Sequence, residues 1–446
     1  MTETALAFDA TAVARAARRA QRRLGAADGS TRSAVLHHLA DQLRDRSASL
    51  VAANQRDLDA AARDDLAAPL LRRLAVGPAK VDDLIDGVVQ LAAQTDPIGR
   101  THRHTRLDDG LVLRQVSAPL GVVLVIFESR PEAVIQIGAL ALRAGCAVLL
   151  KGGAEATHSN RALVDCLRAA LTAAHQDADA VQLIEGRDAA QALLAEDESI
   201  DLVIPRGSSA LVRAIQQATR IPVLGHAEGV CHLVLDDAAD PAMAARLAVD
   251  GKCDYPAACN ATETLLVLRG FLPDLPTVAR ALVDAGVTLR ADDAARDAIA
   301  AAGLPAEPAT ADDWRTEYGD RVLAVRVVDD LDAAIAHIHA HGSAHTESIC
   351  TDDEAVADRF LRAVDAASVF HNASTRFADG YRYGLGAEVG IATGRIHARG
   401  PVGVDGLLTT RWLLRGGGHV AGDYGAGKRA FQHRSLPLDD AAPTDA

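Results

Sequence analysis

Residues 122–151 read VVLVIFESRPEAVIQIGALALRAGCAVLLK, and this stretch decides the fold. An apolar run of six residues, Val122 to Phe127, is followed by a helical segment and then by a second short apolar run, Cys146 to Leu150. Short apolar strands that alternate with helical stretches are typical of a parallel, doubly wound sheet. The stretch therefore predicts the first units of an α/β domain.

The alternation continues to about residue 350. Further short apolar runs follow at 181–184, 202–204, 231–235, 264–268, 322–328 and 348–350. The first hundred residues differ, because their apolar residues recur at helical spacing, as at Leu36, Leu39 and Leu43. Between these regions, Asp109-Gly110 beside an apolar run predicts a β-hairpin over about 103–117. We expect an N-terminal helical region, a projecting hairpin and two α/β domains.

The composition of the 446-residue chain excludes several classes of protein. Hydrophobic residues make up 49%, which argues against a disordered or collagen-like chain. The chain carries 46 Lys and Arg against 60 Asp and Glu, a net charge of −14, and its aromatic residues are only 7 Phe, 5 Tyr and 2 Trp. Because carboxylates repel phosphate backbones and few rings are present for base stacking, we expect no nucleic-acid partner.

Cysteine usage and the lengths of the apolar runs indicate the compartment. The six cysteines show no paired C-x-x-C spacing, which argues against a disulfide framework and a zinc ribbon. The longest clean apolar run, Leu120 to Phe127, is far shorter than the roughly 20 residues of a membrane helix. Acidic residues precede the arginine-rich stretch 15–23, unlike a secretory signal or a transit peptide. We expect a cytoplasmic protein without a membrane partner.

Three motif-like patterns do not predict sites. Residues 422–428 fit G-x-x-x-x-G-K, but Arg429 stands where a P-loop needs Ser or Thr, so we expect a flexible tail. The histidine tract 337–345 has a spacing of two, which splays side chains onto different faces of a helix, so we expect a solvated helix end and no metal. The glycines of 384–390 miss the dinucleotide fingerprint by one position.

Three loops remain as candidate sites. Gly207-Ser208 joins a strand end to a helix start, where free N–H groups either bind a phosphate or form an ordinary N-cap. Lys151 follows a strand at the edge where doubly wound sheets bind ligands, although a solvated lysine is the commoner outcome. Cys259 in a small-residue loop suits a nucleophile, although an inert cysteine is commoner. Cys253 competes for that role, and local sequence does not separate the two.

Together these segments resemble the glutamate-5-semialdehyde dehydrogenases, also called γ-glutamyl phosphate reductases, of the aldehyde dehydrogenase superfamily. The resemblance extends from the early helices to about Gly416. Its most specific segments are 127–131 (FESRP), 149–153 (LLKGG), 204–208 (IPRGS), 254–264 (DYPAACNATET), 317–318 (EY), 342–346 (GSAHT), 372–377 (NASTRF), 384–388 (GLGAE) and 397–401 (HARGP). Residues 255–260 resemble the reductase half of the bifunctional pyrroline-5-carboxylate synthases. Because no kinase domain precedes the reductase in this sequence, we expect a separate glutamate 5-kinase as a partner.

The resemblance implies an aldehyde dehydrogenase-like α/β fold, with two doubly wound α/β domains plus a small β-hairpin oligomerisation flap. It implies an NADP-binding domain over 1–228, with the hairpin at about 103–117 in the flap, and a catalytic domain over 229–370. A C-terminal segment over 371–430 is expected to return to the cofactor domain and flap, followed by a disordered tail over 431–446. A homo-oligomer is also implied.

The family also assigns the catalytic and cofactor residues. Its nucleophile is the cysteine before Asn, which is Cys259 and not Cys253, and Asn260 is expected to help N–H donors stabilise the oxyanion. The implied cofactor is NADP(H). Lys151 and the helix start at Gly207 and Ser208 are expected to hold the nucleotide, and Glu317 stands where relatives contact the nicotinamide ribose.

For the substrate, Arg376 is the candidate for the α-carboxylate, because a guanidinium binds a carboxylate through two hydrogen bonds. Ser129 and Arg130 are expected to meet the phosphate, and no metal is expected. For each arginine, a surface salt bridge is the commoner role apart from the family match.

The implied reaction is the NADPH-dependent reduction of L-glutamate 5-phosphate to L-glutamate 5-semialdehyde and phosphate through a cysteine thioester, the second step of proline biosynthesis from glutamate. An acyl phosphate carries its own leaving group, so Glu228 need not activate water, and we expect a structural or substrate-contact role for it. One alternative is an NAD(P)-dependent semialdehyde dehydrogenase that works in the oxidative, hydrolytic direction. Another, from a different class, is a catalytically silent homologue that serves as a scaffold or metabolite-binding subunit.

Overall fold

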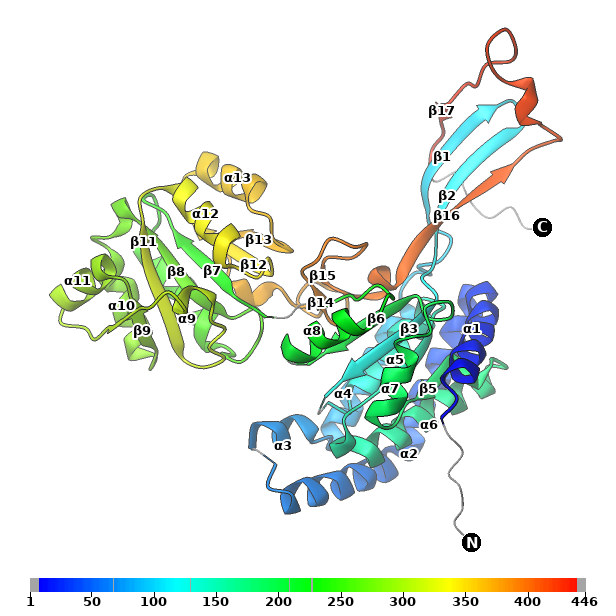
Figure 1. Cartoon of the computed structure of the whole chain (residues 1–446), viewed down its shortest axis with the longest axis horizontal. Coiled ribbons are helices and arrows are strands. Elements are labelled where there is room, and N and C mark those ends of the chain that lie inside the picture. The colour runs from blue at the N-terminus through cyan, green and yellow to red at the C-terminus, as the bar shows by residue number, and fades with distance from the viewer. Residues whose placement is uncertain (1–7, 67, 129, 208, 226–227, 439–446) are drawn as a thin grey trace. The chain divides into compact units, whose positions relative to one another are not determined.

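The computed structural model describes residues 8–66, 68–128, 130–207, 209–225 and 228–438. Its contacts divide the chain into two compact units (Figure 1). The first comprises Met1–Arg206, Ala218–Val223 and Gly403–Ala446, and the second comprises Gly207–Gln217 and Leu224–Val402. The chain thus returns to the first unit at its C-terminal end.

The first unit begins with helices, as the spacing of apolar residues predicts. They are α1 (Ala10–Ala26), α2 (Gly29–Arg63), α3 (Ala68–Leu74) and α4 (Pro78–Ala93). The Asp9 and Asp28 side chains cap α1 and α2 by accepting hydrogen bonds from first-turn backbone N–H groups. Leu36, Leu39 and Leu43 form a buried stripe on α2, which confirms the predicted apolar face.

A parallel sheet forms the core of the first unit (Figure 1). Its elements are β3 (Val122–Phe127), α5 (Ala133–Arg143), β4 (Ala147–Lys151), α6 (Thr157–Ala173), β5 (Val181–Leu183), α7 (Arg187–Leu193) and β6 (Leu202–Arg206). The strand order is β5-β4-β3-β6, so the chain moves first to one side of β3 and later to the other. The point of reversal, at the carboxyl ends of β3 and β6, is where doubly wound sheets bind ligands.

The predicted hairpin is present and forms part of a four-stranded antiparallel sheet. The strands are β1 (Thr101–Asp108), β2 (Leu111–Pro119), β16 (Leu408–Arg415) and β17 (Arg434–Ser435), in the order β16-β2-β1-β17. Gly110, in the turn, has φ of 74°, a left-handed conformation that glycine adopts without strain. Periodicity did not predict β16, because residues 409–412 are all exposed and no apolar alternation marks the strand.

The C-terminal segment lies along the outer edge of β1. β17 pairs with β1, Tyr424 donates a hydrogen bond of 2.9 Å to Asp108, and Arg429 forms an ion pair with the same carboxylate. Residues 422–429, which match part of a P-loop pattern, therefore belong to this edge contact. Within 431–446, expected to be disordered, the structure describes 431–438 and shows a short strand there, whereas 439–446 lie outside the described residues.

The second unit is built on a seven-stranded parallel sheet. From Ser209 on, the elements are α8 (Ser209–Ala218), β7 (Cys231–Leu235), α9 (Pro241–Cys253), β8 (Thr262–Leu268), α10 (Leu275–Asp284), β9 (Thr288–Ala291), α11 (Asp293–Ala301), β10 (Glu307–Pro308), β11 (Val322–Val328), α12 (Leu331–His341), β12 (Thr346–Cys350), α13 (Glu354–Ala363), β13 (Ser368–His371), β14 (Ile391–Ala392) and β15 (Gly400–Pro401). The sheet order is β10-β9-β11-β8-β7-β12-β13.

Helices cover both faces of this sheet (Figure 1). On β8, Leu265 packs into an apolar cluster with α9, α10 and α11, whereas the next residue, Leu266, packs into a second cluster with α12 and α13. Burial on both faces explains why β8 carries the continuous apolar run Leu265–Leu268 instead of an alternating pattern. The strands β9, β10 and β13 escaped prediction, because they are short and contain partly exposed residues.

The histidine tract forms the predicted solvated helix end only in part, because His339 is exposed and His341 half-buried, whereas His337 and His345 are buried. His337 is 5% exposed, and its ring makes edge-on contacts with His232 and Trp314. Its Nδ1 lies 2.8 Å from an Arg326 guanidinium nitrogen. Burial, with the nearby Arg326 charge, lowers the pKa of His337 to about 2. The ring is therefore a neutral part of the core, because α12 turns this position toward the sheet.

Two negative findings concern the described residues. No helix in the described ranges is long and apolar enough to cross a membrane. Across the same ranges, no group of three or more His, Cys, Asp or Glu side chains is arranged to hold a metal ion.

The packing of α13 predicts a large difference between two neighbouring residues. Phe360 is fully buried against the sheet, whereas Leu361 is 40% exposed. Phe360→Ala should lower the free energy of unfolding by about 3–5 kcal/mol, because it leaves a cavity in the core. Leu361→Ala, the matched control on the same helix, should change it by less than about 0.5 kcal/mol. Urea denaturation measures both, and equal effects would contradict the assigned packing.

The neutral, buried His337 predicts a stability difference that appears on acidification. Its folded-state pKa is depressed, so below the ordinary value of about 6.5 only the unfolded chain takes up a proton there. This proton uptake costs about 2 kcal/mol of folding stability between pH 7 and pH 5. Relative to wild type, His337→Gln should therefore gain about 2 kcal/mol over that interval, measured by urea denaturation at each pH. An unchanged difference between the two proteins would contradict the assignment.

Candidate active site

The carboxyl edge of the first sheet presents two cations. Lys151 ends β4 opposite Ile126 of β3, and its side chain is half-buried. Arg130, in the turn between β3 and α5, is also half-buried. Neither side chain forms an ion pair or a hydrogen bond within the described part of the chain. Both are available for an anionic ligand, whereas Ser129 lies outside the described residues.

The neighbouring backbone is closely packed behind Lys151. A Cβ on Gly152 would lie 2.2 Å from Nδ2 of Asn160, so a larger residue would displace that buried amide. At the end of β6, the chain continues into Gly207, which is exposed, and α8 begins at Ser209. Ser208 lies outside the described residues, so its expected phosphate contact stays a prediction.

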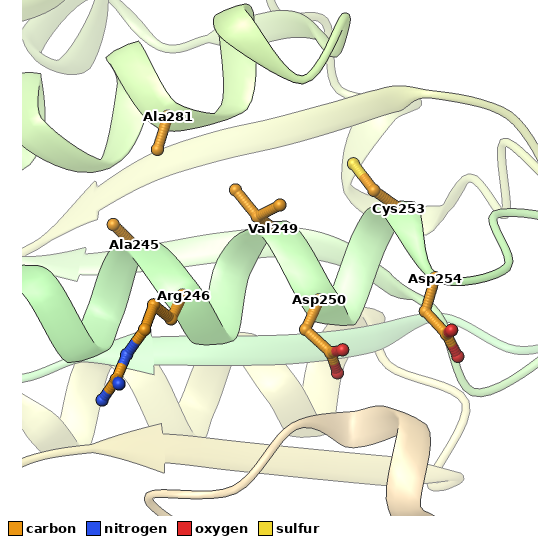
Figure 2. Close-up of a pocket in the computed structure, with 7 residues that line it drawn as sticks. All are labelled: Ala245, Arg246, Val249, Asp250, Cys253, Asp254 and Ala281. Carbon is orange, nitrogen blue, oxygen red and sulfur yellow. The ribbon is translucent and has the colours of Figure 1, made fainter.

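The structure places the two competing cysteines in different environments. Cys253 is the last residue of α9 and packs against the apolar cluster between the sheet and α9–α11, and its burial raises its pKa. Figure 2 shows its thiol on the same side of α9 as Val249, beside a shallow pocket that Ala281 of α10 also lines. Cys259 lies in the loop 254–261 between α9 and β8 and is half-buried. The loop position suits a nucleophile, and the helix position suits packing.

Gly229 packs directly against the backbone of Cys259. A Cβ on Gly229 would lie 2.0 Å from the Cys259 carbonyl oxygen, so only glycine fits without moving the loop. The Gly229 N–H donates a hydrogen bond of 3.0 Å to Oε2 of Glu317. The exposed carboxylate of Glu317, the predicted cofactor residue, is thereby tied to the residue that touches Cys259. The Cys231 thiol also contacts the Cys259 carbonyl, at 3.4 Å.

The Asn260 side chain faces the protein interior. It is 3% exposed, and its Nδ2 donates to the carbonyls of Ala378, at 2.9 Å, and Arg376, at 3.5 Å. These bonds attach the loop to the short helical turn Thr375–Phe377. The amide N–H groups thus have partners on the protein backbone, which favours a role in holding the loop over direct contact with an oxyanion.

Arg376, in the turn Thr375–Phe377, pairs with the residue that begins the cysteine loop. Its Nε pairs with Asp254 at 3.1 Å, and Arg382 pairs with the same carboxylate at 3.0 Å. The hydrogen bond from Arg382, followed by that from Arg376, lowers the pKa of Asp254. The fold therefore brings Arg376 together with the cysteine loop, although it lies more than a hundred residues later in the sequence.

A buried ion pair lies at the base of the loop. Lys252, in the last turn of α9, donates to Oε2 of Glu263, the second residue of β8, at 2.5 Å. Both side chains are fully buried. Burial raises the pKa of Glu263 to about 7, although the Lys252 charge acts in the opposite direction.

Glu228 directly precedes Gly229 in the sequence, and its carboxylate already has a partner. Its carboxylate pairs with Arg213 of α8 at 2.7 Å. This ion pair agrees with the structural role expected for Glu228 more than with a water-activating base.

Sequence reasoning missed several of these residues. Gly229, Lys252 and Arg382 were not assigned a role from the sequence, and neither was Glu263, although it lies within the segment 254–264, because their roles depend on contacts that only the folded chain makes. A charged residue at the start of a strand that continues as an apolar run, as Glu263 is in β8, is a signal that could have indicated a buried partner.

Comparison with known proteins identifies the family. A model of the aldehyde dehydrogenase family matches residues 2–303. The γ-glutamyl phosphate reductase of Synechococcus sp. (strain WH7803) is 54% identical over 95% of this chain and 96% of its own length, and that of Natronomonas pharaonis is 50% identical over 90% and 92%.

Solved structures agree. The crystal structure of γ-glutamyl phosphate reductase from Thermotoga maritima matches with a TM-score of 0.89 and 34% identity, over 92% of this chain and 99% of that one. An engineered glycolyl-CoA reductase with bound NADP⁺ shares the fold at 16% identity, with a TM-score of 0.62 over 91% and 96% of the two chains. The expected aldehyde dehydrogenase-like α/β fold is confirmed, and the chain belongs to the aldehyde dehydrogenase family and, within it, to the γ-glutamyl phosphate reductases.

Proposed function

We propose that this chain reduces L-glutamate 5-phosphate to L-glutamate 5-semialdehyde and phosphate, with NADPH as the reductant, in proline biosynthesis. The observation that carries the proposal is the half-buried thiol of Cys259 in a loop held against Gly229 and Glu317. Relatives named γ-glutamyl phosphate reductase, about half identical over most of the chain, support the choice of substrate.

Cys259 is the proposed nucleophile. Its thiolate attacks the acyl carbon, a carbon–sulfur bond forms, the bond to the phosphate oxygen breaks, and phosphate leaves. Backbone N–H groups of the cysteine loop are the proposed donors to the oxyanion, because the Asn260 amide is directed at carbonyls of its own chain. After hydride reaches the thioester carbon, the carbon–sulfur bond breaks, which releases the semialdehyde and returns the thiolate.

A nicotinamide cofactor follows from the family, and the residues present fit one. The ammonium of Lys151, which has no partner among the described residues, suits a phosphate or ribose oxygen, and the exposed Gly207 after β6 suits a backbone contact to a phosphate. Glu317 is the proposed contact to the nicotinamide ribose. NADPH, when bound, supplies the hydride, and the choice of NADPH over NADH is part of the proposal.

The substrate residues are proposed from their charge. Arg376 uses Nε for Asp254, so its two terminal nitrogens remain for the α-carboxylate of the substrate. Arg130, with Ser129, is the proposed contact to the acyl phosphate.

The hydrolytic alternative is less well supported. An oxidative dehydrogenase needs a base that activates water after the thioester forms. Glu228, the carboxylate nearest in sequence to Gly229, forms an ion pair with Arg213. The other alternative, a catalytically silent scaffold, does not explain why Gly229 and Glu317 hold the cysteine loop in place.

The remaining assignments are proposals of the same kind. Residues 1–228 are the proposed NADP-binding domain and 229–370 the catalytic domain; of the C-terminal segment 371–430, the part from Gly403 on belongs to the first unit. The sheet that contains the hairpin is the proposed oligomerisation flap of a homo-oligomer. A cytoplasmic location agrees with six cysteines that form no disulfide, and a separate glutamate 5-kinase is the proposed source of the acyl phosphate.

Phosphate dependence tests the proposed reaction. In the reverse direction, glutamate semialdehyde and NADP⁺ should yield NADPH only when inorganic phosphate is added, because phosphate must cleave the thioester. Cys259→Ser should lower turnover by about 10³-fold or more, whereas Cys253→Ser should retain most of it. NADPH absorbance measures the rate. Turnover that ignores added phosphate would reject the reductase and favour the hydrolytic alternative.

The contact between Gly229 and Cys259 predicts a second effect. Gly229→Ala should lower kcat by about 10²-fold, because the methyl group must displace the carbonyl of the nucleophile. Gly394→Ala is the matched control, since Gly394 is exposed and a Cβ there meets no atom within 4 Å. The same phosphate-dependent assay compares both variants, and a fully active Gly229→Ala protein would refute the close contact.

A further inference from the structure

We propose that the buried pair Lys252–Glu263 is a positioning device that holds the Cys259 loop and the Glu317 segment together. Neither residue reaches the surface, so neither touches substrate. The inference deepens the proposed function and depends on it for the roles of Cys259 and Glu317.

Burying this ion pair costs free energy. Both side chains are 0% exposed, the ammonium and carboxylate atoms lie 2.5 Å apart, and Oε1 of Glu263 has no hydrogen-bond partner among the described residues. Removing two charges from water costs more than such a pair commonly returns, and apolar residues of similar size often give an equally stable protein. A role beyond stability is therefore needed to explain the pair.

The position of the pair indicates that role. Lys252 lies just before the loop 254–261 and Glu263 just after it, so their contact closes the two ends of the loop that carries Cys259. The two elements approach closely there, because a Cβ on Gly251 would lie 2.5 Å from Oγ1 of Thr262. Any change in the distance between Lys252 and Glu263 is transmitted to the loop.

The same pair reaches the proposed cofactor segment. The Lys252 ammonium lies 5.7 Å from the centroid of the Tyr318 ring, so the charge pair lies against the residue that follows Glu317. Tyr318 follows Glu317, whose carboxylate accepts the hydrogen bond from Gly229. The nucleophile and the cofactor carboxylate are thus attached to one buried charge pair.

Tyr318 is also fixed from its other end. Its hydroxyl donates a hydrogen bond of 2.6 Å to Asp313, and the Arg290 guanidinium lies 5.5 Å from its ring centroid. Lys252 and Glu263 therefore act on a segment that is already rigid, which makes them effective in setting the position of the loop relative to it.

The double variant Lys252→Met/Glu263→Gln separates positioning from stability. It removes both charges while nearly keeping the volume, so its urea midpoint should stay near that of wild type, whereas Lys252→Met and Glu263→Gln alone leave one buried group unpaired and should lower it. In the phosphate-dependent assay, the double variant should lose about tenfold or more in kcat, with KM changed less than about threefold. A kcat within about twofold of wild type would overturn the proposal.

A matched control removes charges elsewhere. Arg32, 1% exposed, pairs with Asp96 in the first unit at 2.7 Å. Arg32→Met/Asp96→Asn should leave kcat within about twofold of wild type, since it does not contact the cysteine loop. A loss of kcat equal to that of the Lys252–Glu263 variant would show that general loss of charge pairs explains the effect, and would overturn the proposal.

Thiol labelling separates this inference from the proposed function. Iodoacetamide modification of Cys259, located by peptide mass spectrometry, should slow about fivefold or more in the double variant. If wild type shows no phosphate-dependent turnover, the proposed function fails and labelling alone decides the positioning role. A labelling rate of Cys259 equal to or above that of wild type would overturn it.

Discussion

Burial of parallel strands on both faces is the constraint on which the rest of the structure depends. In β8, successive residues enter different apolar clusters, so helices must cover both sides of the sheet. The loops between strands and helices then collect at the sheet edges, and the loop after α9 carries Cys259. The proposed nucleophile thus lies outside the apolar core, while α9 and β8 on either side of its loop are anchored in that core.

A protein with a net negative charge can bind anionic ligands where positive side chains are concentrated locally. Arg376 and Arg382 share one carboxylate, Asp254, so the cluster at the start of the cysteine loop has one more positive charge than negative. Lys151 and Arg130 are unpaired within the described residues at the edge of the first sheet. The overall charge of −14 therefore says little about the ligand, because field strength near a site depends on its nearest charges.

Much of the fold was predictable because it depends on local patterns. The runs at 122–127 and 231–235 coincide with β3 and β7, and the hairpin turn lies at Asp109-Gly110 as expected. Prediction failed where local pattern is weak: β16 is exposed along most of its length, and His337 looks polar but is buried by the rotation of α12. In both cases, contacts from distant segments outweigh what the nearby residues indicate.

By itself, the sequence determined most of the strand and helix order and the two α/β units, and its resemblance to a known family singled out the proposed nucleophile Cys259 and the candidate cofactor residue Glu317. Only the tertiary structure decided what supports them: Gly229 behind Cys259, Asn260 turned inward, and Lys252–Glu263 beneath the loop. The physical reason is the separation along the chain over which each kind of interaction acts. Periodicity and turn chemistry act over a few residues, whereas steric contact and charge pairing act through space between residues that the chain itself keeps apart.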